Sequence, residues 1–248
     1  MKKIFLALLM FGAIASAKAQ DAADSLLNFL LQNKAKAALY LVQNDTVLAA
    51  LNKDKYMPLA STVKIMVALE FAKQAAKNVV DKTEMVALKE LDRFYLPNTD
   101  GGAHPTWIGY EKSKGHIKND SIALLHVARG MIMFSSNANT EYLMGILGLD
   151  NVKNNLQLLG VKQHTAIYPI VSALFMYQNP RNKSEQSILK GIKKLSDEQY
   201  SRYIYDMHKA LKYDTVLKSK FRPQDLSVNM QKLWSDRLPA STVAAYAH

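Results

Sequence analysis

The pattern of apolar and polar residues predicts helices over most of the chain and one β-hairpin near its start. Leucines at spacings of one, three and four residues predict an amphipathic helix over residues 22–33. Two short extended runs, residues 37–42 and 46–51, flank the turn-forming sequence Gln43-Asn44-Asp45. Two such runs around a short polar turn are typical of a hairpin.

Helical spacing of apolar residues continues through the rest of the chain. It predicts helices over four further segments: residues 121–134, 139–147, 151–159 and 196–213. The sequence Asn98-Thr99-Asp100-Gly101-Gly102 predicts a loop. Residues 86–96 have a mixed pattern that favours a short extended piece.

The most apolar predicted helix carries the first candidate chemistry. It starts near Ser61, and residues 65–72 are apolar apart from Glu70, which predicts burial. Ser61 and Lys64 are three residues apart and therefore share one face of a helix. Burial lowers the pKa of a lysine because low dielectric disfavours the charged amine, so Lys64 could accept the Ser61 proton. The helix N-terminus also favours an oxyanion or an acidic substrate.

A serine and a lysine at this spacing are weak evidence by themselves. Ser187 and Lys190 form a second copy, followed by Gly191 and two further lysines, a pattern that predicts a solvated helix with a charged lysine. The structural alternative for the first copy is an N-cap serine beside a lysine whose ammonium reaches solvent.

A second polar group lies between two predicted helices. Ser135 and Asn137, in Phe134-Ser135-Ser136-Asn137, would project from this junction toward one cleft. The hydroxyl could relay a proton, and the amide could hold a substrate carbonyl and the Lys64 side chain. The same spacing recurs at Ser227 and Asn229, so the order of the two groups along the chain is more informative than either alone.

This order resembles the penicillin-recognising serine hydrolases, and class A β-lactamases most closely. Ser61-Thr62-Val63-Lys64 matches their S-x-x-K motif, and Ser135-Ser136-Asn137 matches S-D-N with Ser136 in place of the aspartate. The resemblance covers residues 22–160. It implies an α/β (α+β) fold, with an antiparallel sheet and flanking helices beside a helical subdomain.

Beyond residue 160 the resemblance thins, and the third family motif is missing. No K-T-G or K-S-G occurs; the nearest string, Lys112-Ser113-Lys114-Gly115, precedes the second motif instead of following it. Residues 181–238 resemble a lysine-rich helical insertion, and residues 238–245 resemble the capped helix that precedes the third motif. We therefore expect residues 20–248 to form one hydrolase domain that is incomplete at its C-terminus.

The residue that would activate the deacylating water is also not evident. Class A enzymes carry a glutamate some thirty residues after the second motif, but residues 151–184 contain neither Asp nor Glu. His164, Tyr168 and Ser172 are the remaining polar candidates, and a surface loop position is the alternative for His164. The resemblance thus supports an acyl-enzyme more strongly than its rapid hydrolysis.

Composition and charge indicate the location of the protein and the partners it is expected to have. Residues 1–19 are predicted to form a bacterial Sec-type signal peptide, because they contain Lys2 and Lys3, then an apolar run, then Ala17-Lys18-Ala19. The protein is therefore expected to be periplasmic or secreted, and to be attached to the membrane only if the signal peptide is not cleaved. Its removal lowers the net charge from +11 to +8. The lysines are scattered, which argues against nucleic acid as a partner. The chain has no cysteine, and no metal or nucleotide motif occurs, so we expect no cofactor and no metal.

These observations lead to a secreted serine hydrolase of β-lactamase type. We expect Ser61 as nucleophile, Lys64 as base, Ser135 as proton relay and Asn137 as a substrate-binding residue, acting on a small-molecule or peptidoglycan-like acyl substrate. Trp107 is expected to wall the cleft, with burial under the loop as its alternative. The functional alternatives are a D-alanyl peptidase or esterase of the same fold and a penicillin-binding protein that deacylates slowly or not at all.

Overall fold

The structure is a computed structural model that describes residues 24–178, 183–214 and 216–247. The predicted signal peptide, residues 1–19, lies outside these ranges. The chain divides into two compact units, one assigned Met1–Met57 with Thr242–His248 and the other Pro58–Ser241. Among the described residues, the helices are all too short or too polar to cross a bilayer.

The first unit contains the predicted helix and hairpin. A helix covers residues 24–32, and β1 (Leu39–Gln43) pairs antiparallel with β2 (Thr46–Leu51). Asn44 and Asp45 connect the strands with φ angles of 48° and 60°, a left-handed conformation that asparagine and aspartate adopt more readily than most residues. The hairpin prediction is therefore confirmed.

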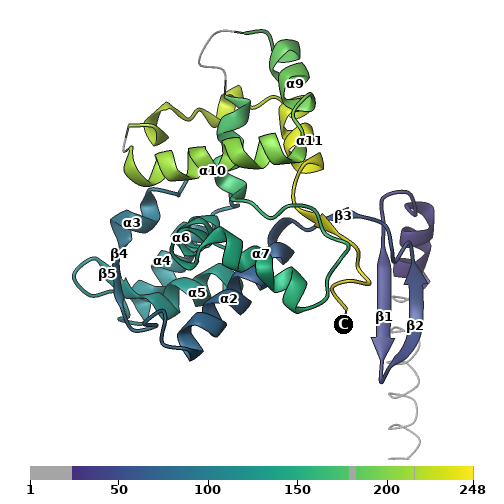
Figure 1. The fold of residues 1–248 in the computed structure, drawn as a ribbon, viewed down its shortest axis with the longest axis horizontal. Helices are drawn as coiled ribbons and strands as arrows, with labels where there is room; N and C mark the ends of the chain where they lie inside the picture. The colour runs from purple at the N-terminus through teal and green to yellow at the C-terminus, as the bar shows by residue number, and fades with distance from the viewer. Residues whose placement is uncertain (1–23, 179–182, 215, 248) are drawn as a thin grey trace, which may run out of the picture. The chain divides into compact units, whose positions relative to one another are not determined.

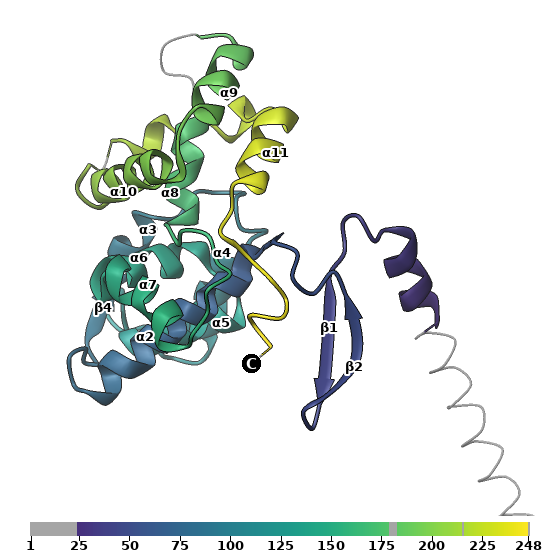
Figure 2. The same ribbon diagram turned by 45° about the vertical axis from the view of Figure 1, so that its right-hand side comes forward.

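The second unit begins with the segment that carries Ser61 and continues through a series of short helices. Its first half consists of a 3-10 turn, five longer helices, one short helix and one strand pair: η1 (Ala60–Val63), α2 (Lys64–Ala76), β4 (Met85–Ala87), α3 (Leu88–Asp92), α4 (Ala103–Ser113), β5 (Ser121–Ala123), α5 (Leu124–Met133), α6 (Asn137–Leu147) and α7 (Leu149–Leu158). Strands β4 and β5 pair antiparallel. The α2, α5, α6 and α7 helices pack against one another (Figures 1 and 2).

The second half of this unit is also mainly helical. Its elements are α8 (Ile170–Leu174), η2 (Phe175–Tyr177), α9 (Glu185–Lys193), α10 (Asp197–Tyr213), η3 (Lys218–Lys220), η4 (Pro223–Asp225), α11 (Val228–Asp236) and β6 (Ala240–Ser241); the short strand β3 (Met57–Pro58) precedes the unit's first turn. The α10 helix packs on α8, and α11 packs on α9 (Figure 1). Ser196 and Gln199 form a capping box that fixes the start of α10.

The apolar face of α2 forms part of the core of this unit. Val63, Met66, Val67 and Phe71 are buried there, whereas Ile65 is half exposed. The expectation of a helix apolar on all sides was therefore too strong, and α2 has one solvent-facing side. Each fully buried large apolar side chain contributes about 1.5–3 kcal/mol of burial free energy, so this face anchors the segment that carries Ser61.

One glycine permits a close approach within the core. A Cβ atom added to Gly130 on α5 would lie 2.4 Å from Nε1 of Trp107 and 2.5 Å from Nδ2 of Asn139. Separations below 3.0 Å require backbone or side-chain movement. The absence of a side chain at Gly130 thus lets the indole and the amide lie directly against α5.

One expectation for the secondary structure was wrong, and another was only partly right. Residues 238–245 form the short strand β6 and a turn, not a capped helix, because Leu59 N donates to Pro239 O and Thr165 N donates to Ala240 O. Residues 86–96 contain the end of β4, which is the short extended piece that was expected, and also the short helix α3, which was not expected. The α4 helix was not predicted, since Pro105 interrupts its pattern, yet proline is tolerated in the first turn of a helix.

Candidate active site

Ser61 lies on the 3-10 turn η1, immediately before α2, and its side chain is exposed. The α-helix itself begins at Lys64, so Ser61 is not an N-cap residue and makes no capping hydrogen bond there. Ala60 precedes it with φ of 45°, a left-handed conformation that is costly for alanine. This local conformation presents the Ser61 hydroxyl outward instead of folding it back on the helix.

Lys64 is buried and makes three polar contacts. Its side chain is among the largest that are fully enclosed, with a residue exposure of 2%. The Nζ atom lies 2.6 Å from Ser135 O, 2.9 Å from Ser135 Oγ and 2.8 Å from Asn137 Oδ1. The lysine therefore does not extend its amine to solvent, and the structural alternative for this residue is wrong.

Ser135 lies between the two residues of the first motif. Its Oγ is 2.7 Å from Ser61 Oγ and 2.9 Å from Lys64 Nζ. The sequence suggested direct proton transfer from Ser61 to Lys64, but this continuous chain of hydrogen bonds runs through Ser135. The backbone of Ser135 has φ of 66°, which is uncommon for a residue other than glycine and aims its side chain into this position.

The neighbours of Ser135 hold the second motif in place. Ser136 caps α6, since its Oγ accepts a hydrogen bond from Asn139 N at 3.3 Å, and it also contacts His104 Nδ1 at 2.8 Å. A serine hydroxyl can fill this capping role as an aspartate would. Asn137 occupies the first position of α6 and directs its Oδ1 to Lys64.

Burial changes the protonation of Lys64. Loss of hydration lowers the pKa of its amine from 10.5 to about 8, while the negative charge of Asp100 opposes this shift. Asp100 lies in the Gly-rich loop, where its carboxylate also accepts hydrogen bonds from Gly102 N and His104 N. The sequence offered only the loop composition as a signal for this residue, and its electrostatic role was missed.

The three contacts of Lys64 are compatible with a protonated amine and with a neutral one. In the neutral amine, the hydrogen-bonding roles are divided. Two N–H bonds can be directed to Ser135 O and Asn137 Oδ1, which leaves the lone pair directed at Ser135 Oγ. A protonated amine would donate all three bonds. Because the pKa is about 8, both forms are accessible near neutral pH. The arrangement can therefore withdraw a proton from Ser61 through Ser135 and later return it.

Comparison with known proteins identifies the family of the chain. The β-lactamase enzyme family matches residues 21–245. The chain belongs to this family.

Two solved structures are similar to this β-lactamase-family chain. One is described as the structure of PBP-A, with 22% identity, a TM-score of 0.41, and coverage of 66% of this chain and 59% of that one. The other is a class A β-lactamase from Bacteroides cellulosilyticus DSM 14838, with 21% identity, a TM-score of 0.44, and coverage of 76% and 66%. The chain thus spans 59% and 66% of the lengths of these two proteins. No curated protein matches.

Trp107 does not reach the candidate site. It is on α4 with no exposed surface, and its Nε1 donates to Glu111 Oε1 at 3.2 Å. A side chain that is completely enclosed cannot contact a substrate, so the expected role of Trp107 as a wall of the cleft is corrected to a role in the core.

The three polar candidates for activating water have other partners. Tyr168 is buried, burial strongly raises the pKa of its phenol, and its hydroxyl donates to Arg237 O. Ser172 is fully buried and its Oγ donates to the carboxylate of Glu141. Burial lowers the pKa of His164, and its Nδ1 lies 2.5 Å from Thr165 O.

Glu141 is a buried carboxylate that the sequence analysis did not single out. Its Oε1 accepts hydrogen bonds from Val171 N at 2.7 Å and Ser172 N at 3.2 Å, and its Oε2 lies 3.0 Å from His208 Nδ1. Because Glu141 lies on α6 and accepts hydrogen bonds from N–H groups at the start of α8, it fixes that short helix against α6. Glu141 thus holds the start of α8 in place.

The second copies of both motifs lie elsewhere on the surface. Ser187 and Lys190 are exposed on α9. Ser227 caps α11 by accepting Met230 N at 3.2 Å, and the exposed Asn229 donates to Glu185. These residues are explained by helix capping and solvation.

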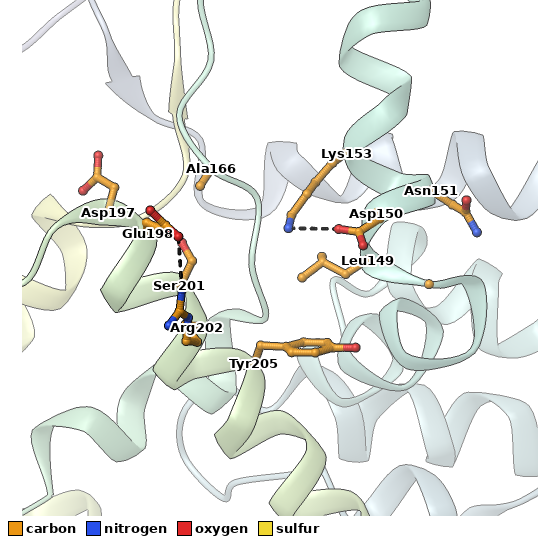
Figure 3. A pocket seen from close by; sticks show the side chains of 11 residues that line it. Leu149, Asp150, Asn151, Lys153, Ala166, Asp197, Glu198, Ser201, Arg202 and Tyr205 are labelled. Carbon is orange, nitrogen blue, oxygen red and sulfur yellow. Dashed lines mark hydrogen bonds and ion pairs between the residues drawn. The ribbon is translucent and has the colours of Figure 1, made fainter.

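A large surface pocket is separate from these residues. An open pocket of about 760 Å³ lies between α7 and α10 (Figure 3). Its lining includes Asp150 paired with Lys153 and Glu198 paired with Arg202, so its charges are largely compensated. None of the four residues Ser61, Lys64, Ser135 and Asn137 lines it.

Proposed function

We propose that this chain is a secreted serine hydrolase of the class A β-lactamase type that forms an acyl-enzyme through Ser61 with a β-lactam or a related acyl substrate. The observation that carries the proposal is the hydrogen-bonded series from Ser61 Oγ through Ser135 Oγ to Lys64 Nζ. Membership of the β-lactamase enzyme family supports the same chemistry.

Acylation begins with removal of a proton from Ser61. Neutral Lys64 takes the proton of the Ser135 hydroxyl, and Ser135 takes that of Ser61, as Ser61 Oγ forms a bond to the substrate carbonyl carbon. The carbonyl oxygen becomes an oxyanion. When the tetrahedral species collapses, the carbon–nitrogen bond breaks, and the nitrogen receives a proton from Lys64 through Ser135. Lys64 is then neutral again.

Two further groups contact the substrate in this proposal. The backbone N–H of Ser61 supplies half of an oxyanion hole, and one such donor is worth about 3 kcal/mol in the transition state. Asn137 binds a substrate carbonyl through its side-chain amide while its Oδ1 remains on Lys64. Ser61 lies on η1, immediately before α2, and Asn137 is the first residue of α6; both helices contribute buried residues to the core.

Deacylation is the slow step. Residues 151–184 contain no carboxylate, Ser172 and Tyr168 are buried with partners, and Glu141 is committed to α8. A water molecule at the acyl-enzyme would therefore have no strong base beside it from this segment. The same observation favours a second candidate function, a penicillin-binding protein that deacylates slowly or not at all.

The substrate and location are proposed from the same features. A signal peptide over residues 1–19 would place the enzyme in the periplasm or outside the cell. The substrate would be a small molecule or a peptidoglycan-like acyl compound. A D-alanyl peptidase or an esterase of this fold would use the same four residues.

Covalent labelling tests the proposal. A fluorescent penicillin should label the protein, and Ser61→Ala should abolish the label. The matched control is Ser187→Ala, which removes the hydroxyl of the other S-x-x-K copy on the exposed face of α9 and should leave labelling intact. Labelling that survives Ser61→Ala would refute Ser61 as nucleophile, and an unlabelled wild-type protein would refute β-lactam acylation.

A further inference from the structure

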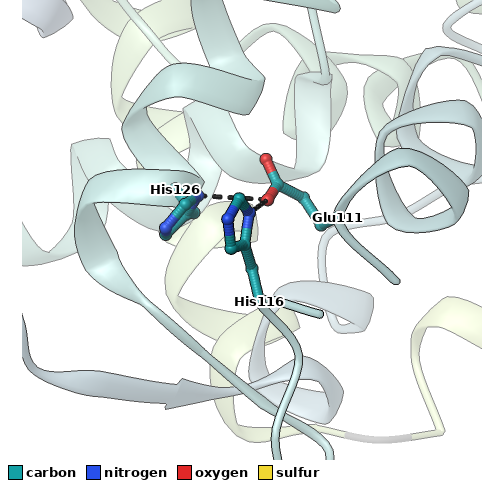
Figure 4. Close-up of side chains that lie close together, drawn as sticks. All are labelled: Glu111, His116 and His126. Atoms are coloured by element: carbon teal, nitrogen blue, oxygen red, sulfur yellow. Dashed lines mark hydrogen bonds and ion pairs between the residues drawn. The ribbon is translucent and has the colours of Figure 1, made fainter. Parts of the chain in front are cut away.

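A second cluster of titratable side chains lies apart from Ser61 and Lys64. Glu111 on α4, His116 in the loop after α4 and His126 on α5 present one ligand atom each within 4.8 Å of one another (Figure 4). Oε2 of Glu111 lies 2.6 Å from His116 Nδ1 and 3.0 Å from His126 Nδ1. We propose that these three residues form a binding site for a divalent transition-metal ion, with Zn²⁺ as the expected occupant.

The choice of ion follows from the donor atoms. Two imidazole nitrogens and one carboxylate oxygen suit Zn²⁺ and its first-row neighbours, whereas Mg²⁺ and Ca²⁺ prefer sites built only from oxygen. Zinc–ligand bonds are about 2.0–2.2 Å, which separates the ligand atoms of a tetrahedral site by about 3.3 Å. The observed separations of 2.6 Å and 3.0 Å therefore need to widen by about 0.7 Å and about 0.3 Å, respectively, for an ion to bind.

The surroundings of Glu111 orient it toward the two histidines. Its side chain is 3% exposed, and its other oxygen, Oε1, accepts a hydrogen bond from the buried Trp107 Nε1 at 3.2 Å. A partner of this kind fixes the orientation of a metal-binding carboxylate. The indole therefore leaves Oε2 directed at His116 and His126.

The two histidines are held by different means. His126 is on α5, and His116 N donates to Glu111 O at 3.1 Å, which ties the loop back to the end of α4. Gly115 allows this reversal with φ of 70°. The ring centroids of His116 and His126 are 4.1 Å apart, so both nitrogens approach the carboxylate from one side.

An ion could enter this site from solvent. The side chains of His116 and His126 are 39% and 19% exposed, while Glu111 lies beneath them. Three protein ligands leave a fourth position open to water. No metal was expected from the sequence because it contains no metal-binding motif, and only the fold brings His126 to the other two residues.

The alternative is a carboxylate that simply accepts hydrogen bonds from two imidazoles and an indole. The two cases differ in saturable binding. Full-length protein without an affinity tag, treated with a chelator and dialysed, is titrated with Zn²⁺ by calorimetry and with Co²⁺ by visible absorption. We expect one ion per chain, with no displacement by a hundredfold excess of Mg²⁺.

Single variants locate the ion. His116→Ala and His126→Ala should each weaken Zn²⁺ binding at least tenfold, and His164→Ala, a histidine outside the cluster, should leave it unchanged. His116 is partly exposed on a loop, so its variant should fold, and thermal unfolding checks this. The unfolding temperature of the wild type should rise when Zn²⁺ is added. The proposal would be overturned if the wild type showed no saturable Zn²⁺ binding below 100 μM, which corresponds to about 5.5 kcal/mol of binding free energy. It would also be overturned if His116→Ala and His126→Ala bound Zn²⁺ as tightly as the wild type.

Discussion

The lowered pKa of Lys64 predicts a specific pH dependence of acylation. If neutral Lys64 is the proton acceptor, the acylation rate follows the fraction of neutral amine, which is half-maximal at a pKa of about 8. That fraction is about 9% at pH 7 and about 91% at pH 9, since the ratio of neutral to protonated amine changes tenfold for each pH unit. The rate should therefore rise about tenfold between pH 7 and pH 9 and then level off.

The assay is the pseudo-first-order rate of labelling by a fluorescent penicillin from pH 6 to pH 10, with the rate corrected for hydrolysis of the free compound. Only the acylation step is observed, so slow deacylation does not affect the result. A rate that is constant from pH 6.5 to pH 9.5, or one that continues to rise steeply up to pH 10, would refute neutral Lys64 as the base.

Asp100 supplies a directional control for the same experiment. Its negative charge favours protonated Lys64 and so raises the pKa of the amine. Asp100→Asn keeps an acceptor oxygen for Gly102 N or His104 N but removes the charge. The midpoint of the pH profile should move to lower pH. A midpoint that moves to higher pH would show that the charge at Asp100 does not act on Lys64 in this way.

Two other predictions concern stability and turnover. Ala60 has a left-handed φ of 45°, so Ala60→Gly should raise the free energy of unfolding by about 0.5–1 kcal/mol in thermal or urea unfolding. The control, Ala72→Gly at an exposed position of α2, should lower this free energy by about 1 kcal/mol. Equal effects of the two changes would contradict the strain at Ala60. With a chromogenic β-lactam, a burst of product equal to the enzyme concentration should precede a slow steady rate of hydrolysis. The variant His164→Ala should leave this steady rate unchanged. Rapid turnover without a burst would mean that a base outside residues 151–184 activates the water.

Local pattern was sufficient for the hairpin and for most long helices. Residues 46–51 and 196–213 have strong periodicity and clear turn or capping residues, and the structure has elements there, β2 at Thr46–Leu51 and α10 at Asp197–Tyr213. The family and the fold class were also confirmed. Residues 238–245 were misassigned because their conformation depends on hydrogen bonds from Leu59 and Thr165, which are distant in the sequence.

The candidate site could be predicted only in part, because some of its contacts join residues that are distant in the sequence. Ser61 and Lys64 are close in sequence, and motif order linked them to Ser135 and Asn137. The position of Ser135 between Ser61 and Lys64 depends on a left-handed backbone that no residue type at that position signals. The influence of Asp100 on Lys64 depends on how a loop folds, and periodicity carries no information about it.

The close packing at Gly130 has a consequence for how relatives of this chain can diverge. Any larger residue at Gly130 would place its Cβ against Trp107 and Asn139, which are both enclosed. A change at Gly130 therefore becomes tolerable only after smaller residues replace both Trp107 and Asn139, and reversion of either one is then blocked in turn. The residues at these three positions should therefore covary among relatives of this chain.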